Sequence, residues 1–150
     1  MRILLADDDE LIREIVAEGL RLHAYEVEAV CDGAAALAAV RRHRPGLILL
    51  DAKMPTLDGF AVLAALKADP ALNHVPVIML TALRNARDVI EARRLGASDY
   101  LAKPFDISNV LQRVRLWTGK RAGVGQTLAG ADETSLVFGE TRPEEAHWLE

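Results

Sequence analysis

Polar side chains close four short apolar runs of this sequence: Asp7 with Asp8, Asp51, Thr81 and Lys103. A carboxylate is costly to bury inside an apolar strand, so the run before Asp51 is expected to end at that residue. Carboxylates that lie close together repel one another unless a cation joins them or one of them is protonated. An all-oxygen ligand set of this kind favours Mg²⁺. An aspartate nucleophile, a divalent cation, a hydroxyl and a lysine are together the groups that stabilise a transferring phosphoryl group.

The apolar runs predict five β-strands, over residues 2–6, 25–30, 47–51, 75–81 and 98–102. Apolar residues at three- and four-residue steps predict helices between and after them, over about 11–20, 34–42, 58–68, 85–95 and 107–117. Five β-α repeats predict an α/β, doubly wound three-layer sandwich with a parallel sheet. Three of the runs are apolar throughout and belong inside the sheet, so the flavodoxin-like strand order 2-1-3-4-5 fits best.

This strand order also predicts where the polar side chains meet. Open α/β sheets bind ligands at the carboxyl edge of their strands, and the first and third strands are neighbours in the order above. We therefore expect Asp7, Asp8 and Asp51 to converge at one edge. The fourth and fifth strands should deliver Thr81 and Lys103 to the same edge.

The helical patterns predict which side chains are buried. Leu11 and Ile15 belong to the apolar stripe of the first helix, and such a stripe normally faces the core. Val89 and Ile90 are expected to point inward from the fourth helix.

Composition narrows the class of protein. A chain of 150 residues suits one domain with a tail, and a net charge of −4 argues against a nucleic-acid surface dominated by charge. The single cysteine rules out an intrachain disulfide and makes a cysteine-based metal site implausible. No apolar stretch approaches the roughly 18 residues that span a membrane, and no signal-peptide pattern opens the chain. We expect a cytoplasmic protein.

The sequence changes character after residue 118. Glycines are spread through polar sequence without helical or strand periodicity, which predicts a flexible linker or tail over 119–150. Thr141, with Pro143 and Glu144 after it, has the spacing of a helix start. The expected organisation is a domain over 1–118, which either acts alone or is joined through this segment to a further helix or domain.

The sequence resembles the receiver domain of two-component response regulators over roughly residues 1–118. Each of the five signals that carry this resemblance is weak alone, and their combination in the family's order is highly specific. The signals are Asp7-Asp8, Leu49-Leu50-Asp51 followed by Met54-Pro55, Asp58-Gly59, Thr81-Ala82 and Lys103-Pro104-Phe105. The resemblance implies a phosphoacceptor signalling switch rather than an enzyme, although such a domain catalyses its own phosphorylation and dephosphorylation.

The resemblance also implies roles for the acidic residues. Asp51 would accept a phosphoryl group from a histidine kinase or a histidine phosphotransfer protein. Asp7, Asp8 and Asp51 would bind the metal, Mg²⁺ or Mn²⁺, with Asp8 as a direct ligand. The backbone carbonyl of Lys53 would complete the set of protein ligands.

Further roles are implied for the residues of the fourth and fifth strands. Thr81 and Lys103 would hold the phosphoryl oxygens, and Tyr100 matches the aromatic switch position that turns inward on activation. The Lys103–Pro104 peptide bond is expected to be cis, as in the family. The face made by the fourth helix, fifth strand and fifth helix would control a downstream protein or an attached output domain, and could support a homodimer. No direct contact with nucleic acid or membrane is expected of this domain.

Two positions depart from what is typical of the family. Lys53 stands two residues after Asp51, and Leu83 stands two residues after Thr81. In the family, side chains at these positions modulate how water reaches the phosphoaspartate. A cation and an apolar group offer no carboxylate or amide to orient water, which predicts slow loss of the phosphoryl group.

Three other functions stay open. A phosphatase of the haloacid-dehalogenase type also uses an aspartate nucleophile and Mg²⁺, but it needs a second aspartate where Lys53 stands. A flavin-binding module can share the fold, but the acidic residues after the first strand would repel a phosphate. A receiver that binds partners without being phosphorylated is the third alternative.

Overall fold

A parallel five-stranded sheet forms the centre of the molecule. The computed structural model describes residues 1–82 and 86–118. The sheet has the order β2-β1-β3-β4-β5, so the predicted strand order is confirmed. Its strands are β1 (Arg2–Ala6), β2 (Glu26–Val30), β3 (Leu47–Asp51), β4 (Val77–Thr81) and β5 (Asp99–Ala102).

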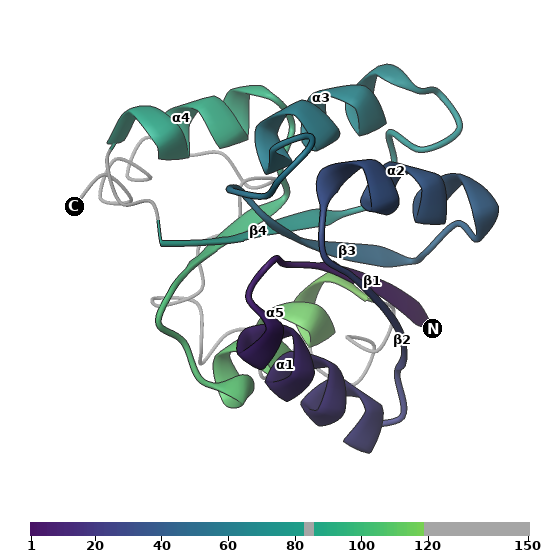
Figure 1. Cartoon of the computed structure of the whole chain (residues 1–150), viewed down its shortest axis with the longest axis vertical. Helices are drawn as coiled ribbons and strands as arrows, with labels where there is room; N and C mark the ends of the chain where they lie inside the picture. Colours follow the sequence, from purple (N-terminus) through teal and green to yellow (C-terminus); the bar gives the residue numbers. More distant parts are fainter. Residues whose placement is uncertain (83–85, 119–150) are drawn as a thin grey trace.

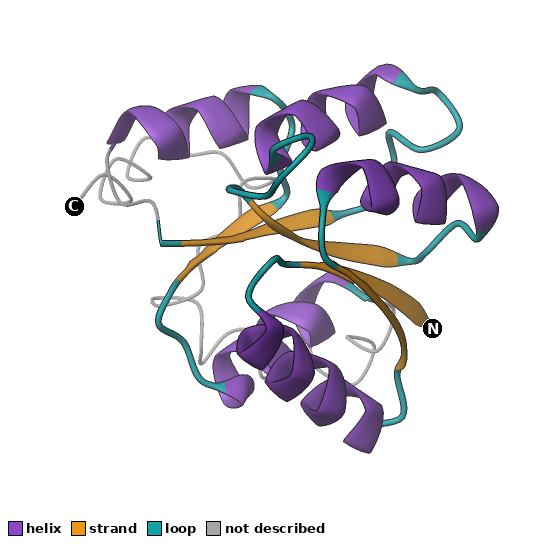
Figure 2. Cartoon of the chain, viewed as in Figure 1, coloured by secondary structure: helices purple, strands orange, loops and turns teal. Residues whose placement is uncertain are grey.

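Helices cover both faces of this sheet. In Figure 1, α1 and α5 lie against one face, and α2, α3 and α4 lie against the other. Figure 2 shows the same three layers by secondary structure, with the strands between the two helical layers. The predicted α/β three-layer sandwich is therefore confirmed. The helices are α1 (Glu10–Leu22), α2 (Gly33–Arg42), α3 (Gly59–Ala68), α4 (Ala86–Arg94) and α5 (Ile107–Trp117).

Aspartates begin four of these helices. In each case the carboxylate accepts a hydrogen bond from a backbone N–H three residues later, which satisfies one of the donors left open in the first turn. These N-cap residues are Asp9 of α1, Asp32 of α2, Asp58 of α3 and Asp106 of α5. The side chains of these aspartates therefore fix where the four helices begin after the strands.

The core consists of two apolar layers, one on each side of the sheet. Every residue of β3 and β4 is buried, as the continuous apolar runs predicted. Leu4, Ile48 and Leu50 face the α2-α3-α4 layer, whereas Ile3 and Leu49 face the α1-α5 layer. This alternation along each strand follows from the two-residue repeat of a β-strand.

The apolar stripes of α1 and α4 are only partly buried, and the inward orientation predicted for Ile90 is wrong. Leu11 is 65% exposed and Ile15 is 53% exposed, because the sheet and α5 cover only the stripe of α1 that contains Val16, Ala17 and Leu20. A helix presents only part of its circumference to a sheet, so a wide apolar stripe cannot be buried entirely. Ile90 is likewise 53% exposed on α4, and Val89 is buried as predicted.

The ends of some elements also differ from the prediction. β4 begins at Val77 rather than at residue 75, because Pro76 has no N–H to donate to the sheet. The Lys103–Pro104 peptide bond is cis, as predicted. Within 1–82 and 86–118, no helix has both the length and the apolar character needed to cross a membrane. Leu83 and the segment 119–150, with the helix start predicted near Thr141, lie outside the described residues.

Candidate functional site

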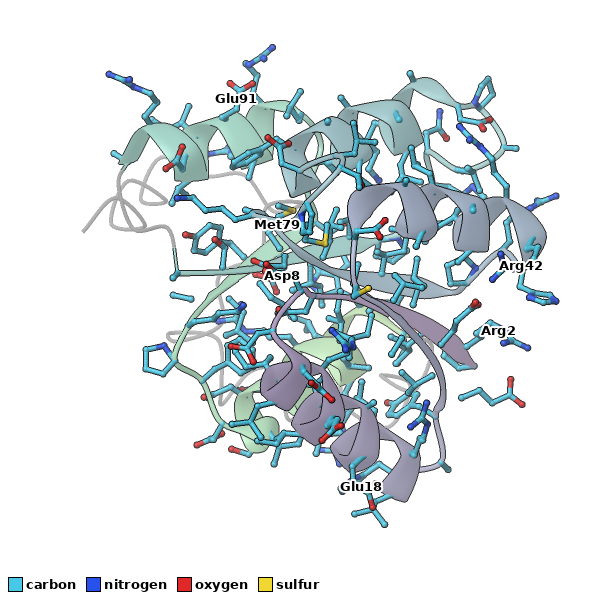
Figure 3. The ribbon with its side chains drawn as sticks, viewed as in Figure 1. Arg2, Asp8, Glu18, Arg42, Met79 and Glu91 are labelled. Carbon is cyan, nitrogen blue, oxygen red and sulfur yellow. The ribbon has the colours of Figure 1, made fainter. Side chains whose placement is uncertain are left out.

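The register of the sheet brings the predicted site residues to one edge. Ala6 pairs with Leu50, so Asp7 follows β1 beside Asp51 at the end of β3. Thr81 pairs with Ala102, which places the start of the next loop, at Lys103, beside the end of β4. Figure 3 shows Asp8 at this edge, in the turn between β1 and α1.

Three carboxylates gather at this edge. Asp7, Asp8 and Asp51 each offer one oxygen, and these oxygens lie within 4.8 Å of one another. Asp7 is fully buried and Asp51 is 4% exposed, whereas Asp8 is open to solvent. A cation could therefore reach the cluster from the side of Asp8 and contact the two buried carboxylates beneath.

Lys103 joins two of these carboxylates. Its Nζ lies 2.9 Å from Asp7 Oδ2 and 3.5 Å from Asp51 Oδ2. Burial acts to lower the pKa of Lys103, but its contacts with Asp7 and Asp51 outweigh burial and raise that pKa above its ordinary value. Lys103 therefore stays charged, as a residue that pairs with anionic oxygens must.

The pKa of Asp51 is raised, which means that its surroundings disfavour the negative charge of its ionised form. Burial, reinforced by the charge of Asp7, raises the pKa of Asp51 to about 7, although Lys103 and the Lys53 N–H oppose the shift. Three carboxylates and one ammonium group leave a net charge of about −2 when all are ionised, which a divalent cation would neutralise. The hard oxygen donors therefore fit Mg²⁺ or Mn²⁺ in charge and in chemistry.

The backbone at the start of α3 lies very close to the backbone at the end of β3. The N–H of Gly59 donates to the carbonyl of Ala52 at 2.7 Å, which holds the start of α3 against the end of β3. A Cβ at residue 59 would lie 2.1 Å from the Asp51 carbonyl oxygen, so only glycine allows this approach. The Asp58-Gly59 signal therefore has a physical explanation, since Asp58 caps α3 and Gly59 lets the helix touch the strand.

The other predicted site residues surround this centre. Thr81 is buried at the end of β4, and its carbonyl accepts a 2.9 Å hydrogen bond from the N–H of Lys103. Tyr100 is partly buried on β5 and packs against the α2-α3-α4 layer. The backbone nitrogen of Lys53 lies 3.5 Å from Asp51 Oδ1, so the start of the following loop is beside this carboxylate. The role predicted for the Lys53 carbonyl stays a prediction.

Sequence reasoning missed two sets of contacts. Arg13 on α1 donates from Nη1 to the Asp7 carbonyl at 2.8 Å and so steadies the acidic turn. Asp99 on β5 is fully buried and binds Arg113 and Trp117 of α5. An acidic residue inside a buried strand needs a partner, and Arg113 with Trp117 one helical turn later was the available signal.

Comparison with known proteins identifies the family to which this chain belongs. The family model described as the response regulator receiver domain matches residues 3–115. RpaA of Synechocystis, a DNA-binding dual master transcriptional regulator, is 42% identical over 114 residues, which cover 76% of this chain and 47% of RpaA. The response regulator PleD of Caulobacter vibrioides is 44% identical over 117 residues, which cover 78% of this chain and 26% of PleD.

A solved structure agrees with the sequence relatives. The receiver domain of the sensor histidine kinase PA1611 from Pseudomonas aeruginosa, with a magnesium ion coordinated in its active site cleft, is 33% identical with a TM-score of 0.72. The match covers 77% of this chain and 95% of that domain, whereas this chain spans less than half the length of RpaA or PleD. The chain belongs to the response regulator receiver domain family, the phosphoacceptor modules of two-component signalling.

Proposed function

We propose that this domain is a phosphorylation-controlled switch whose phosphoacceptor is Asp51. The observation that carries the proposal is the convergence of Asp51 with two further carboxylates and the Lys103 ammonium group at one edge of the sheet. Receiver domains of response regulators take their phosphoryl group from histidine kinases and control output domains. A histidine kinase, or a histidine phosphotransfer protein, is accordingly the donor that we propose for this chain.

The metal site would be formed by Asp7, Asp8 and Asp51, with the Lys53 carbonyl as a further ligand. The raised pKa of Asp51 supports this assignment, because neighbouring negative charge and burial both disfavour the ionised nucleophile. When bound, Mg²⁺ or Mn²⁺ would offset that negative charge and the charge that develops on the phosphoryl oxygens. The magnesium in the PA1611 receiver domain supports the choice of Mg²⁺.

The transfer follows from the positions of the side chains. An ionised Asp51 oxygen forms a new O–P bond while the P–N bond of phosphohistidine breaks, and the imidazole leaves with the electron pair. Lys103, now 3.5 Å from Asp51 Oδ2, would pair with an oxygen of the new phosphoryl group. Thr81, buried beside Lys103, would donate its hydroxyl to another phosphoryl oxygen.

The output would pass through the face made by α4, β5 and α5. Tyr100 lies on β5, between the two helices in the sequence. The N–H of Lys103, just after β5, donates to the carbonyl of Thr81 at the end of β4. We propose that a shift of Thr81 toward the phosphoryl group opens space for Tyr100 and changes this face. A downstream protein, a second copy of the chain or an attached output domain would read the change.

The domain boundary belongs to this proposal. We propose that residues 1–118 are the receiver domain and that 119–150 are a linker or tail, which either follows a receiver that acts alone or leads into a further helix or domain. The last described helix ends at Trp117, and the family model ends at residue 115. The matched relatives RpaA and PleD extend well beyond the region that they share with this chain, which supports a second domain.

Intact mass tests the proposal most directly. The wild type, incubated with acetyl phosphate and Mg²⁺, should gain the mass of one phosphoryl group, and Asp51→Asn should not. Asp58→Asn is the matched control, because Asp58 is an exposed aspartate that caps α3. A gain in Asp51→Asn would reject the nucleophile, and no gain in the wild type with either acetyl phosphate or a phosphorylated histidine phosphotransfer protein would reject the switch.

A further inference from the structure

A buried polar cluster joins β5 to α5 on the α1-α5 side of the sheet. The Asp99 side chain is fully buried, and the Arg113 side chain is 12% exposed. Arg113 Nη1 donates to Asp99 Oδ1 at 2.6 Å, and the Trp117 indole N–H donates to Asp99 Oδ2 at 3.0 Å. The N–H of Tyr100 also donates to Asp99 Oδ1, at 2.8 Å. Both oxygens of the carboxylate are therefore used.

This polar cluster differs from the other contacts that α5 makes with the core. Elsewhere α5 packs through apolar side chains, namely Val110, Leu111 and Val114. A buried ion pair contributes little net stability, because desolvation of both charges offsets their attraction, whereas loss of one partner is strongly destabilising. Polar contacts of this kind are directional, so they define one position of α5 along β5 where apolar packing would tolerate several.

The cluster lies between β5, which carries Tyr100, and the carboxyl end of α5. Arg113 Nη1 also approaches the Tyr100 carbonyl oxygen, at 3.3 Å, so one guanidinium group contacts two successive residues of β5. Trp117 is the last residue of α5, and the chain continues from there into 119–150. A movement of the β5 backbone at Tyr100 would therefore shift Asp99 and Arg113 directly, and through them the carboxyl end of α5.

We propose that Asp99, Arg113 and Trp117 are positioning residues that transmit the state of β5 to the end of α5. The proposal rests on the proposed phosphoacceptor function, because phosphorylation of Asp51 supplies the movement of β5. In the unphosphorylated domain the cluster holds α5 in the observed register. Phosphorylation alters the contact between Arg113 and the Tyr100 carbonyl, and the end of α5 moves with it.

Tryptophan fluorescence can report this movement. The chain has two tryptophans, and in a Trp148→Phe background Trp117 is the only one that remains. The probe is beryllofluoride with Mg²⁺, which mimics the phosphoryl group on aspartate. The emission of Trp117 should change on addition of the probe and should not change in Trp148→Phe/Asp51→Asn. Intact mass with acetyl phosphate shows independently that the Trp148→Phe protein is still phosphorylated.

The decisive variant is Arg113→Met in the same background. It should still be phosphorylated, as judged by mass, and lose the response of Trp117. Arg94→Met is the matched control, because Arg94 is an exposed arginine that pairs with Glu91 on its own helix. If Arg113→Met does not fold, Asp99→Asn/Arg113→Met removes both charges and avoids an unpaired buried one. Amide hydrogen exchange of the 107–118 peptide gives a second readout that does not depend on the indole.

The outcomes separate this inference from the proposed function. Phosphorylation without any change at Trp117 or in the exchange of α5 would overturn the inference and leave the switch intact. Persistence of both responses in Arg113→Met would overturn it as well. No phosphorylation of the wild type would overturn the proposed function, and the inference with it. Loss of the responses in Arg113→Met, with phosphorylation retained and Arg94→Met unchanged, supports the inference.

Discussion

Replacing Asp51 with asparagine should stabilise the metal-free domain at neutral and higher pH. Asp51 is 4% exposed, and burial together with the charge of Asp7 raises its pKa from 3.8 to about 7. The folded state thus binds a proton more tightly than the unfolded chain. This group costs stability wherever the unfolded aspartate is ionised, and the cost grows as pH rises from about 4 to about 7. Asparagine has nearly the same shape and no charge, so it avoids that cost.

The raised pKa of Asp51 also sets the expected size of this stabilisation. About three pKa units correspond to about 4 kcal/mol as an upper bound. Lys103 lies 3.5 Å from Asp51 Oδ2 and loses a partner in the variant, which reduces the gain. We expect Asp51→Asn to raise the free energy of unfolding by about 1–3 kcal/mol at pH 8, and by close to zero at pH 4.

Urea unfolding in the presence of a chelator, at several pH values between 4 and 8, measures this difference. Only the difference between variant and wild type is used, because other carboxylates titrate over the same range and cancel. Asp58→Asn is the control for replacement of an aspartate as such, since it should show no matching increase with pH. A variant less stable than the wild type at pH 8, or a difference that does not depend on pH, would refute the electrostatic reasoning.

Three further predictions concern the same edge of the sheet. Gly59→Ala should destabilise the domain by about 2–4 kcal/mol in urea unfolding and should slow phosphorylation by acetyl phosphate. The reason is that a Cβ would lie 2.1 Å from the Asp51 carbonyl oxygen. Unchanged stability would contradict the observed approach of α3 to β3. Mg²⁺ at about 100 times its dissociation constant should stabilise the wild type by about 2.7 kcal/mol and Asp8→Asn by much less, as measured by thermal unfolding; equal stabilisation would exclude Asp8 as a ligand. Lys53→Asn/Leu83→Glu should shorten the half-life of the phosphorylated form, measured by mass after removal of the donor; an unchanged half-life would reject the predicted role of these positions.

Much of the candidate site could be predicted because its residues stand where apolar strands end, and the sequence shows those positions. A parallel strand that is buried on both faces is an almost continuous apolar run, so the first polar residue after Leu50 marks both the end of β3 and the position of Asp51. Thr81 and Lys103 are placed by the same reasoning on β4 and β5, once the strand order is known. The spacing of Asp58 and Gly59 likewise encodes a helix cap and a close approach of backbones, both of which are local.

The exposed faces of the helices were harder to predict. Periodicity shows that α1 has an apolar stripe, but the width of the stripe that is buried depends on what packs against it. Leu11 and Ile15 belong to the apolar stripe by their spacing and are nevertheless largely exposed. The same holds for Ile90 on α4, where neighbouring residues in sequence cannot show how the helix is rotated about its axis.

The sequence alone determined the order of the elements, the edge at which the acidic residues meet and the family to which they point, because each depends on residue types at fixed local spacings. The pairing of the charges, in contrast, depends on the folded arrangement. That arrangement placed Lys103 between Asp7 and Asp51, and it brought Arg113 and Trp117 onto the buried carboxylate of Asp99. These partners come from different elements, and a buried charge selects its partner by distance in the folded molecule rather than by separation along the chain.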